Sequence, residues 1–175
     1  MSAEPIVIRP PAPDDASSLL AFELENRAWF ERWVQSRDPA FYALEGIRAA
    51  IERAAQARRA DSGYQYLVFG TDGRIVGGVN LRDVRRGHYR SAELGYHVGE
   101  REIGRGFASA AVALCLGEAF GALDLWRVEA AVRPINRASI RVLERNGFAA
   151  WGRSTRSIEF DGDWFDQLHF ERHAG

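Results

Sequence analysis

The chain has 175 residues, of which 46% are hydrophobic and 27% are charged, and its formal net charge is −1. These values predict one ordinary soluble domain over residues 1–175, and the near-neutral charge lacks the basic excess that marks nucleic-acid binding. The 23 basic residues are all arginine, so a lysine nucleophile or a lysine Schiff base is excluded.

The sequence has neither a leader-like N-terminus nor an apolar run of 18 residues, so we expect neither export nor membrane insertion. Its single cysteine, Cys115, lies in an apolar segment and is interpreted as a small buried hydrophobe. One cysteine cannot form a disulfide within the chain, and a reducing cytoplasm is the expected location.

The first half of the chain is predicted to be mainly helical. A short strand over residues 6–9 ends at Pro10 and Pro11, and an amphipathic helix follows over residues 16–33. Pro39 is predicted to begin a second helix, which ends near residue 62.

From residue 64 the hydrophobic period changes to that of strands. Two strands around the turn at Gly73 form a hairpin, and an Asp161-Gly162 turn predicts a closing hairpin near the end. In chain order, the predicted elements are strands 66–69, 75–81 and 92–98, helix 107–120, strand 126–132, helix 136–145, and strands 149–160 and 164–170. This order predicts a mixed α/β sheet with one right-handed crossover and too few βαβ units for a Rossmann domain.

The most informative segment is the glycine-rich turn at residues 103–106, which opens the apolar helix. The first backbone N–H groups of a helix lack partners and carry partial positive charge, so such a turn is a candidate site for a diphosphate. Gly104 and Gly106 let an anion approach the backbone, and Arg101 and Arg105 add charge at the rim. Taken alone, the turn also fits a plain tight turn or a dinucleotide loop with Ser109 in place of its third glycine.

Four segments together resemble the GNAT acetyltransferases, and most of all their RimJ/RimL branch, which acetylates the N-terminal amines of ribosomal proteins. The resemblance extends over about the whole chain. It rests on residues 101–106 (R-E-I-G-R-G), residues 136–139 (N-R-A-S) with 146–148 (N-G-F), residues 26–29 (N-R-A-W) with Trp33, and residues 161–166 (D-G-D-W-F-D).

The resemblance implies a GNAT fold of six to seven strands and about four helices, with acetyl-CoA between two splayed parallel strands. The backbone of Tyr96, His97 and Val98 would pair with pantetheine like an added strand, and Asn136 would bond to the pantetheine arm. The pyrophosphate would be held by the loop and the helix start, which comprise Arg101, Ile103, Gly104, Arg105, Gly106, Phe107, Ala108 and Ser109.

The implied reaction is direct attack of a neutral amine on the thioester, with no metal and no covalent enzyme intermediate. In the strand over 92–98, the alternation places Glu93 and His97 on the face opposite the apolar residues, and Glu93 is the first candidate for the base. Asp83, His97 and water remain alternatives. Leu143 occupies the position of the tyrosine acid of many relatives, so the RimL pattern assigns the acid to Ser139, whose hydroxyl could instead simply bond to the backbone.

Trp29, Trp33 and Asp166 are expected to border the acceptor groove, although the tryptophans could be packing residues and Asp166 could pair with an arginine. The preferred acceptor is a protein N-terminal α-amine. A small amine such as an aminoglycoside or a polyamine, and a non-catalytic CoA-binding module, are the alternatives. No nucleic-acid, membrane or metal partner is expected, and the sequence leaves a homodimer open.

Overall fold

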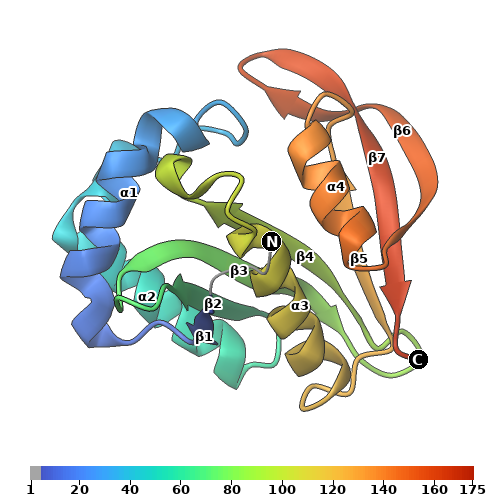
Figure 1. The fold of residues 1–175 in the computed structure, drawn as a ribbon, viewed down its shortest axis with the longest axis horizontal. Helices are drawn as coiled ribbons and strands as arrows, with labels where there is room; N and C mark the ends of the chain where they lie inside the picture. The colour runs from blue at the N-terminus through green and yellow to red at the C-terminus, as the bar shows by residue number, and fades with distance from the viewer. Residues whose placement is uncertain (1–4) are drawn as a thin grey trace.

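A seven-stranded sheet runs through the computed structural model, which describes residues 5–175 (Figure 1). The strand order is β1-β2-β3-β4-β5-β7-β6, and all neighbours are antiparallel except β4 and β5, which are parallel. The predicted mixed sheet with one parallel pair is therefore confirmed. The strands are β1 (Val7–Arg9), β2 (Tyr64–Phe69), β3 (Ile75–Arg85), β4 (Ser91–Val98), β5 (Arg127–Val132), β6 (Ala149–Phe160) and β7 (Asp163–His173).

The helices form two groups on opposite faces of the sheet. The α-helices are α1 (Ala16–Phe30), α2 (Leu44–Arg59), α3 (Phe107–Phe120) and α4 (Arg137–Arg145), and short 3-10 helices are η1 (Pro13–Asp15), η2 (Pro39–Tyr42) and η3 (Glu100–Glu102). Helices α1 and α2 share an apolar cluster with Leu67 and Ile75, whereas α3 and α4 pack on the larger cluster that contains Val79, Leu94 and Val128.

Strand β4 shows the alternation expected from its sequence. Ala92 and Leu94 are buried in the larger cluster, and Tyr96 and Val98 pack against it. Successive side chains of a strand point to opposite faces, so Glu93 lies on the other face. One face of β4 therefore contacts the apolar core, and the other carries the Glu93 carboxylate.

Several predicted boundaries differ from the structure. Helix α1 ends at Phe30 and continues as a turn. Pro39 begins η2 instead of the second long helix. Ala43 has an extended backbone and separates η2 from α2. A Cβ on Gly46 would lie 2.1 Å from the carbonyl oxygen of Ala40, so the start of α2 packs tightly against η2. Strand β3 runs on to Arg85 because its pairing with β4 resumes after a bulge.

Two other expectations are confirmed. Asp161 and Gly162 have φ values of 51° and 85°, as a two-residue hairpin turn between β6 and β7 requires. Cys115 is fully buried in α3, and burial raises the pKa of its thiol to about 12. Within residues 5–175, no helix combines the length and apolarity needed to cross a membrane.

Candidate active site

The glycine turn connects η3 to α3 in the way that its sequence predicts. Gly104 and Gly106 have φ values of 79° and 84°, a conformation that favours glycine. The helical ladder begins where the N–H of Ala110 donates to the carbonyl of Gly106. The N–H groups of the three residues before Ala110 therefore have no carbonyl partner within the helix, and they point outward from its N-terminus. A Cβ on Gly104 would meet nothing within 4 Å, so the backbone there faces open space.

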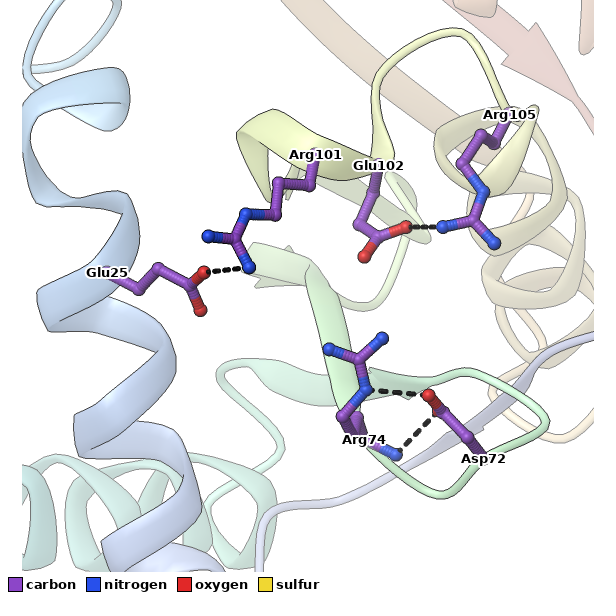
Figure 2. Close-up of polar contacts among 6 residues, drawn as sticks. All are labelled: Glu25, Asp72, Arg74, Arg101, Glu102 and Arg105. Atoms are coloured by element: carbon purple, nitrogen blue, oxygen red, sulfur yellow. Dashed lines mark hydrogen bonds and ion pairs between the residues drawn. The ribbon is translucent and has the colours of Figure 1, made fainter.

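The two rim arginines are each matched by a carboxylate. Figure 2 shows Arg101 extending from η3 to Glu25 of α1, at 3.0 Å, and Arg105 folded back onto Glu102. The Arg105 guanidinium also lies over the Phe107 ring. The Arg101–Glu25 pair is exposed, and such pairs contribute about 0 to 1 kcal/mol, whereas the Glu102 carboxylate that Arg105 contacts is buried. Because both arginines are paired, the outward N–H groups at the start of α3 are the feature of this loop that could receive an anion.

Asn26 of α1 anchors η3, the segment before the glycine turn, and sequence reasoning missed this contact. This α1 residue is 6% exposed, and its Oδ1 accepts a 2.8 Å hydrogen bond from the N–H of Glu100, the first residue of η3. Its Nδ2 donates to the carbonyl of Phe22 at 2.9 Å. A Cβ on Gly99 would lie 3.1 Å from Oδ1, so glycine permits the close approach. The sequence signal for Asn26 was the N-R-A-W match at residues 26–29, which did not indicate what the side chain would contact.

The parallel strands separate immediately beyond Glu93. In the described residues, β4 pairs with β5 over residues 91–93 and 127–129, ending at the Glu93 and Glu129 pair. Beyond that point β4 stays paired with β3, and β5 stays paired with β7. The backbone edge of Tyr96, His97 and Val98 is thereby turned toward the gap between the strands. This is the splayed pair that the resemblance implied.

The His97 ring is a packing element of this strand. It is enclosed by Phe30, at 4.9 Å between ring centres, and Phe22, and it sits over Gly78, where a Cβ would lie 2.7 Å from its Cε1. Burial lowers the pKa of His97 to about 4. The ring is therefore neutral at physiological pH, and this placement weighs against His97 as the base.

Ser139 lies in the first turn of α4 and faces β4. Asn136 caps the helix, because its Oδ1 accepts the Ser139 N–H at 3.1 Å. The Ser139 Oγ lies 2.6 Å from the Tyr96 hydroxyl, which also donates to the Ser139 carbonyl at 3.0 Å. The side chain of Tyr96, expected only to contribute backbone, therefore joins the serine.

Glu93 lies on the other face of β4, in a groove of about 420 Å³. It forms a 2.5 Å ion pair with Arg82 of the neighbouring strand. Asp83, the alternative base, lines the same groove because the β3 bulge turns it there with a φ of 51°. Glu129 adds a third carboxylate, which pairs with Arg85 at 2.9 Å. The structure thus brings both candidate carboxylate bases together beside the splay.

The groove also has an aromatic wall. Trp151 of β6 and His169 of β7 line it, with their rings 5.2 Å apart, and His169 Nε2 lies 2.7 Å from the Ser154 hydroxyl. Neither Trp151 nor His169 was predicted as a site residue, because the sequence of β6 and β7 indicated only a closing hairpin.

The three predicted acceptor residues are not among those that line this groove. Trp29 and Trp33 pack edge to face, with ring centres 6.1 Å apart, at the end of α1. Asp166 pairs with Arg153 at 2.5 Å and accepts the N–H of Arg156 at 2.9 Å, and these bonds lower its pKa. Arginine pairing, one of its two expected roles, is therefore what the structure shows. Within residues 5–175, no three His, Cys, Asp or Glu side chains are placed so that they could hold one metal ion together.

Comparison with known proteins agrees with this geometry. The family model described as "Acetyltransferase (GNAT) domain" matches residues 6–149. The probable N-acetyltransferase YjcK of Bacillus subtilis is 34% identical over 95% of this chain and 92% of its own. The ribosomal protein uS5-alanine N-acetyltransferase of Escherichia coli is 25% identical over 96% of this chain and 87% of its own.

A solved relative extends the comparison to the cofactor. Mycobacterium smegmatis RimJ, determined in complex with CoA-disulfide, is 31% identical with a TM-score of 0.91, and the match covers 97% of this chain and 82% of that one. The sequence and structural relatives thus include RimJ/RimL ribosomal-protein acetyltransferases, as the sequence resemblance implied. This chain belongs to the GNAT family of N-acetyltransferases.

Proposed function

We propose that this enzyme transfers the acetyl group of acetyl-CoA to a primary amine, and that its preferred acceptor is a protein N-terminal α-amine. The proposal rests on one observation: β4 has hydroxyl groups on one face and a carboxylate on the other. The hydroxyls of Tyr96 and Ser139 lie on its α4 side, and Glu93 lies on its groove side, immediately before the strands separate. A thioester in the splay would have a hydrogen-bond donor on one face and a base on the other.

The residues around the loop fit acetyl-CoA without a metal ligand set. The outward N–H groups at the start of α3 suit a pyrophosphate, and the open backbone at Gly104 leaves room for it. The free edge of β4 suits the amides of pantetheine, which would extend the sheet by strand-like pairing. The CoA-disulfide complex of the related RimJ supports the same ligand class.

The reaction needs a neutral amine, because an ammonium nitrogen has no lone pair to donate. Glu93, directly or through water, is proposed to take this proton. The nitrogen attacks the carbonyl carbon, the new C–N bond forms, and a backbone N–H near Val98 stabilises the oxyanion. The C–S bond then breaks with its electron pair on sulfur. Ser139 is proposed to give its proton to that sulfur, which leaves as the CoA thiol, and to regain a proton through solvent from the nitrogen, which loses one as the amide forms.

The groove offers carboxylates to an amine. Asp83, Glu93 and Glu129 line it together with Arg85 and His169, and Glu93 is paired with Arg82 and Glu129 with Arg85. An α-amine, with an ordinary pKa near 8, is deprotonated more readily than a lysine amine near 10.4. The E. coli relative is named as an N-acetyltransferase that acts on alanine of ribosomal protein uS5, which supports a protein amine as the acceptor.

The proposal is tested by a turnover screen with free CoA thiol as the readout. The acceptors are short peptides with free N-termini, a polyamine and an aminoglycoside, each at matched concentration. We expect the peptides to give the highest kcat/KM. A higher kcat/KM for the polyamine or the aminoglycoside would overturn the acceptor assignment. Acetyl-CoA binding with no turnover on any amine would indicate a binding module.

A further inference from the structure

Arg133 follows the last residue of β5 and has no carboxylate partner among residues 5–175. Its guanidinium carbon lies 4.7 Å from the ring centre of Phe160 and 4.8 Å from that of Phe165, both in the β6–β7 hairpin. Its Nε and Nη1 are buried, and neither has a hydrogen-bond partner in the described part of the chain. The side chain is thus held by aromatic rings while its positive charge lacks an anion.

The alternation of the strands places this guanidinium on the groove face of the sheet. Val132 is buried in the cluster that packs against α3 and α4, so Ala131 and Arg133 belong to the opposite face. Ala131 lines the groove, as does Gln167 of β7. Phe165, which the guanidinium contacts, lies two residues before Gln167, and residues two apart in a strand share a face. The guanidinium therefore extends the groove beyond Ala131.

Opposite charges are separated along the length of this groove. Glu93 and Glu129 form the last pair of β4 and β5 before the strands separate, and under the proposed function their carboxylates mark the end where the amine reacts. Arg133 is four residues farther along the chain than Glu129, a span of about 13 Å at the rise of a β-strand. This spacing matches an extended peptide that carries an anionic group about four residues from its N-terminal amine.

The chemistry of the guanidinium favours a carboxylate at this second position. Arginine stays charged in proteins, and a charged group buried without a hydrogen-bond acceptor is costly. The phenylalanine rings attract the charge but offer no oxygen atom to the N–H groups. A carboxylate supplies two oxygens in the planar arrangement that a guanidinium matches. The CoA pyrophosphate is not the expected partner, because the glycine turn opens α3, which packs on the other face of the sheet.

We propose that Arg133 is a specificity-determining residue, which binds a carboxylate of the acceptor peptide about four residues from the reacting amine. The inference rests on the proposed acetylation of an N-terminal amine and adds the peptide sequence that the enzyme prefers. The peptide runs extended along β5, from Glu93 toward the β6–β7 hairpin. Arg133 binds charge there and takes no part in the proton transfers of the reaction.

Octapeptides with one aspartate test the inference, each compared with the same peptide that carries asparagine instead. The aspartate stands at position 2, 5 or 8, and C-terminal amidation removes the other possible carboxylate. Release of the CoA thiol gives kcat/KM. At position 5 we expect aspartate to exceed asparagine about 5- to 30-fold in kcat/KM, because a charged hydrogen-bonded pair forms. At positions 2 and 8 we expect no advantage for aspartate.

Substitutions of the arginine locate the effect. Arg133→Gln should abolish the advantage of aspartate at position 5, while kcat/KM for the asparagine peptide and the KM for acetyl-CoA stay within about 2-fold. Arg133→Lys keeps the charge but lacks the planar fork, so it should retain part of the advantage. Arg141→Gln is the matched control, at an exposed arginine of α4, and should retain all of it. Thermal melts check that each variant is folded.

The outcomes distinguish this inference from the proposed function. Equal kcat/KM for the two position-5 peptides, or an advantage of aspartate that survives in Arg133→Gln, would overturn the role of Arg133 and leave peptide acetylation intact. No turnover with any peptide would overturn the proposed acceptor, and this inference with it. If Arg133→Gln does not fold, the three aspartate positions in the parent enzyme and the Arg133→Lys variant decide the question.

Discussion

Asn26 is expected to control both the stability of the fold and the affinity for acetyl-CoA. It is the buried α1 residue whose side chain accepts the N–H of Glu100 and donates to the carbonyl of Phe22. Asn26→Ala removes both hydrogen bonds and takes from the Glu100 N–H its partner on α1. The loop that enters the glycine turn then loses its attachment to α1.

The magnitude follows from these contacts. The net contribution of a typical intramolecular hydrogen bond is about 0.5 to 1.5 kcal/mol, so the loss of these two should lower the free energy of unfolding by about 1 to 3 kcal/mol. Ordering one loop residue costs about 1 to 2 kcal/mol. If acetyl-CoA must reorder one such residue on binding, its Kd should rise about 5- to 30-fold.

The assays are denaturant unfolding and calorimetric titration with acetyl-CoA. Glu25→Ala is the matched control, because the neighbouring side chain forms an exposed 3.0 Å ion pair with Arg101, worth about 0 to 1 kcal/mol. We expect Glu25→Ala to unfold like the parent protein. Asn26→Ala with the stability of Glu25→Ala and an unchanged Kd would refute the anchoring role.

Three further predictions concern the cofactor turn, the base and the buried histidine. Gly106→Val, at a φ of 84°, should weaken acetyl-CoA binding by about 1 to 3 kcal/mol in calorimetry without unfolding the domain, and an unchanged Kd would place the pyrophosphate elsewhere. Glu93→Gln should move the rise of kcat/KM to higher pH, and an unaltered profile would transfer the role to Asp83 or water. His97 has a pKa lowered to about 4 in the fold, so its contribution to stability is complete above pH 6.5 and is lost as the pH falls toward 4. This loss approaches about 3 kcal/mol, and a His97→Leu variant with the same acid slope of stability would contradict it.

The parts of the fold that follow local patterns were predictable from the sequence. Strand alternation over residues 92–98 correctly placed Ala92 and Leu94 in the core and Glu93 on the opposite face. The glycines at 104 and 106 correctly marked a positive-φ turn before a helix. Such features depend on neighbours within a few residues, so local sequence determines them.

Contacts between distant segments were not predictable in this way. The Tyr96 side chain meets Ser139 only after β4, α3 and α4 have packed, and Asn26 meets Glu100 across 74 residues. The predicted start of a helix at Pro39 failed because Pro39 suits any helical first turn, while the extended Ala43 separates η2 from α2. The Arg101 and Arg105 ion pairs likewise depend on where α1 and η3 come together.

Competition between two peptides tests the central claim most directly. One peptide has a free N-terminus and no lysine, and the other has a blocked N-terminus and one lysine, with the remaining residues identical. Both are incubated together with the enzyme and acetyl-CoA, and mass spectrometry locates the added acetyl group. We predict acetylation of the free α-amine at a rate far above that of the blocked lysine peptide. Preferential acetylation of the lysine peptide would contradict the proposed acceptor.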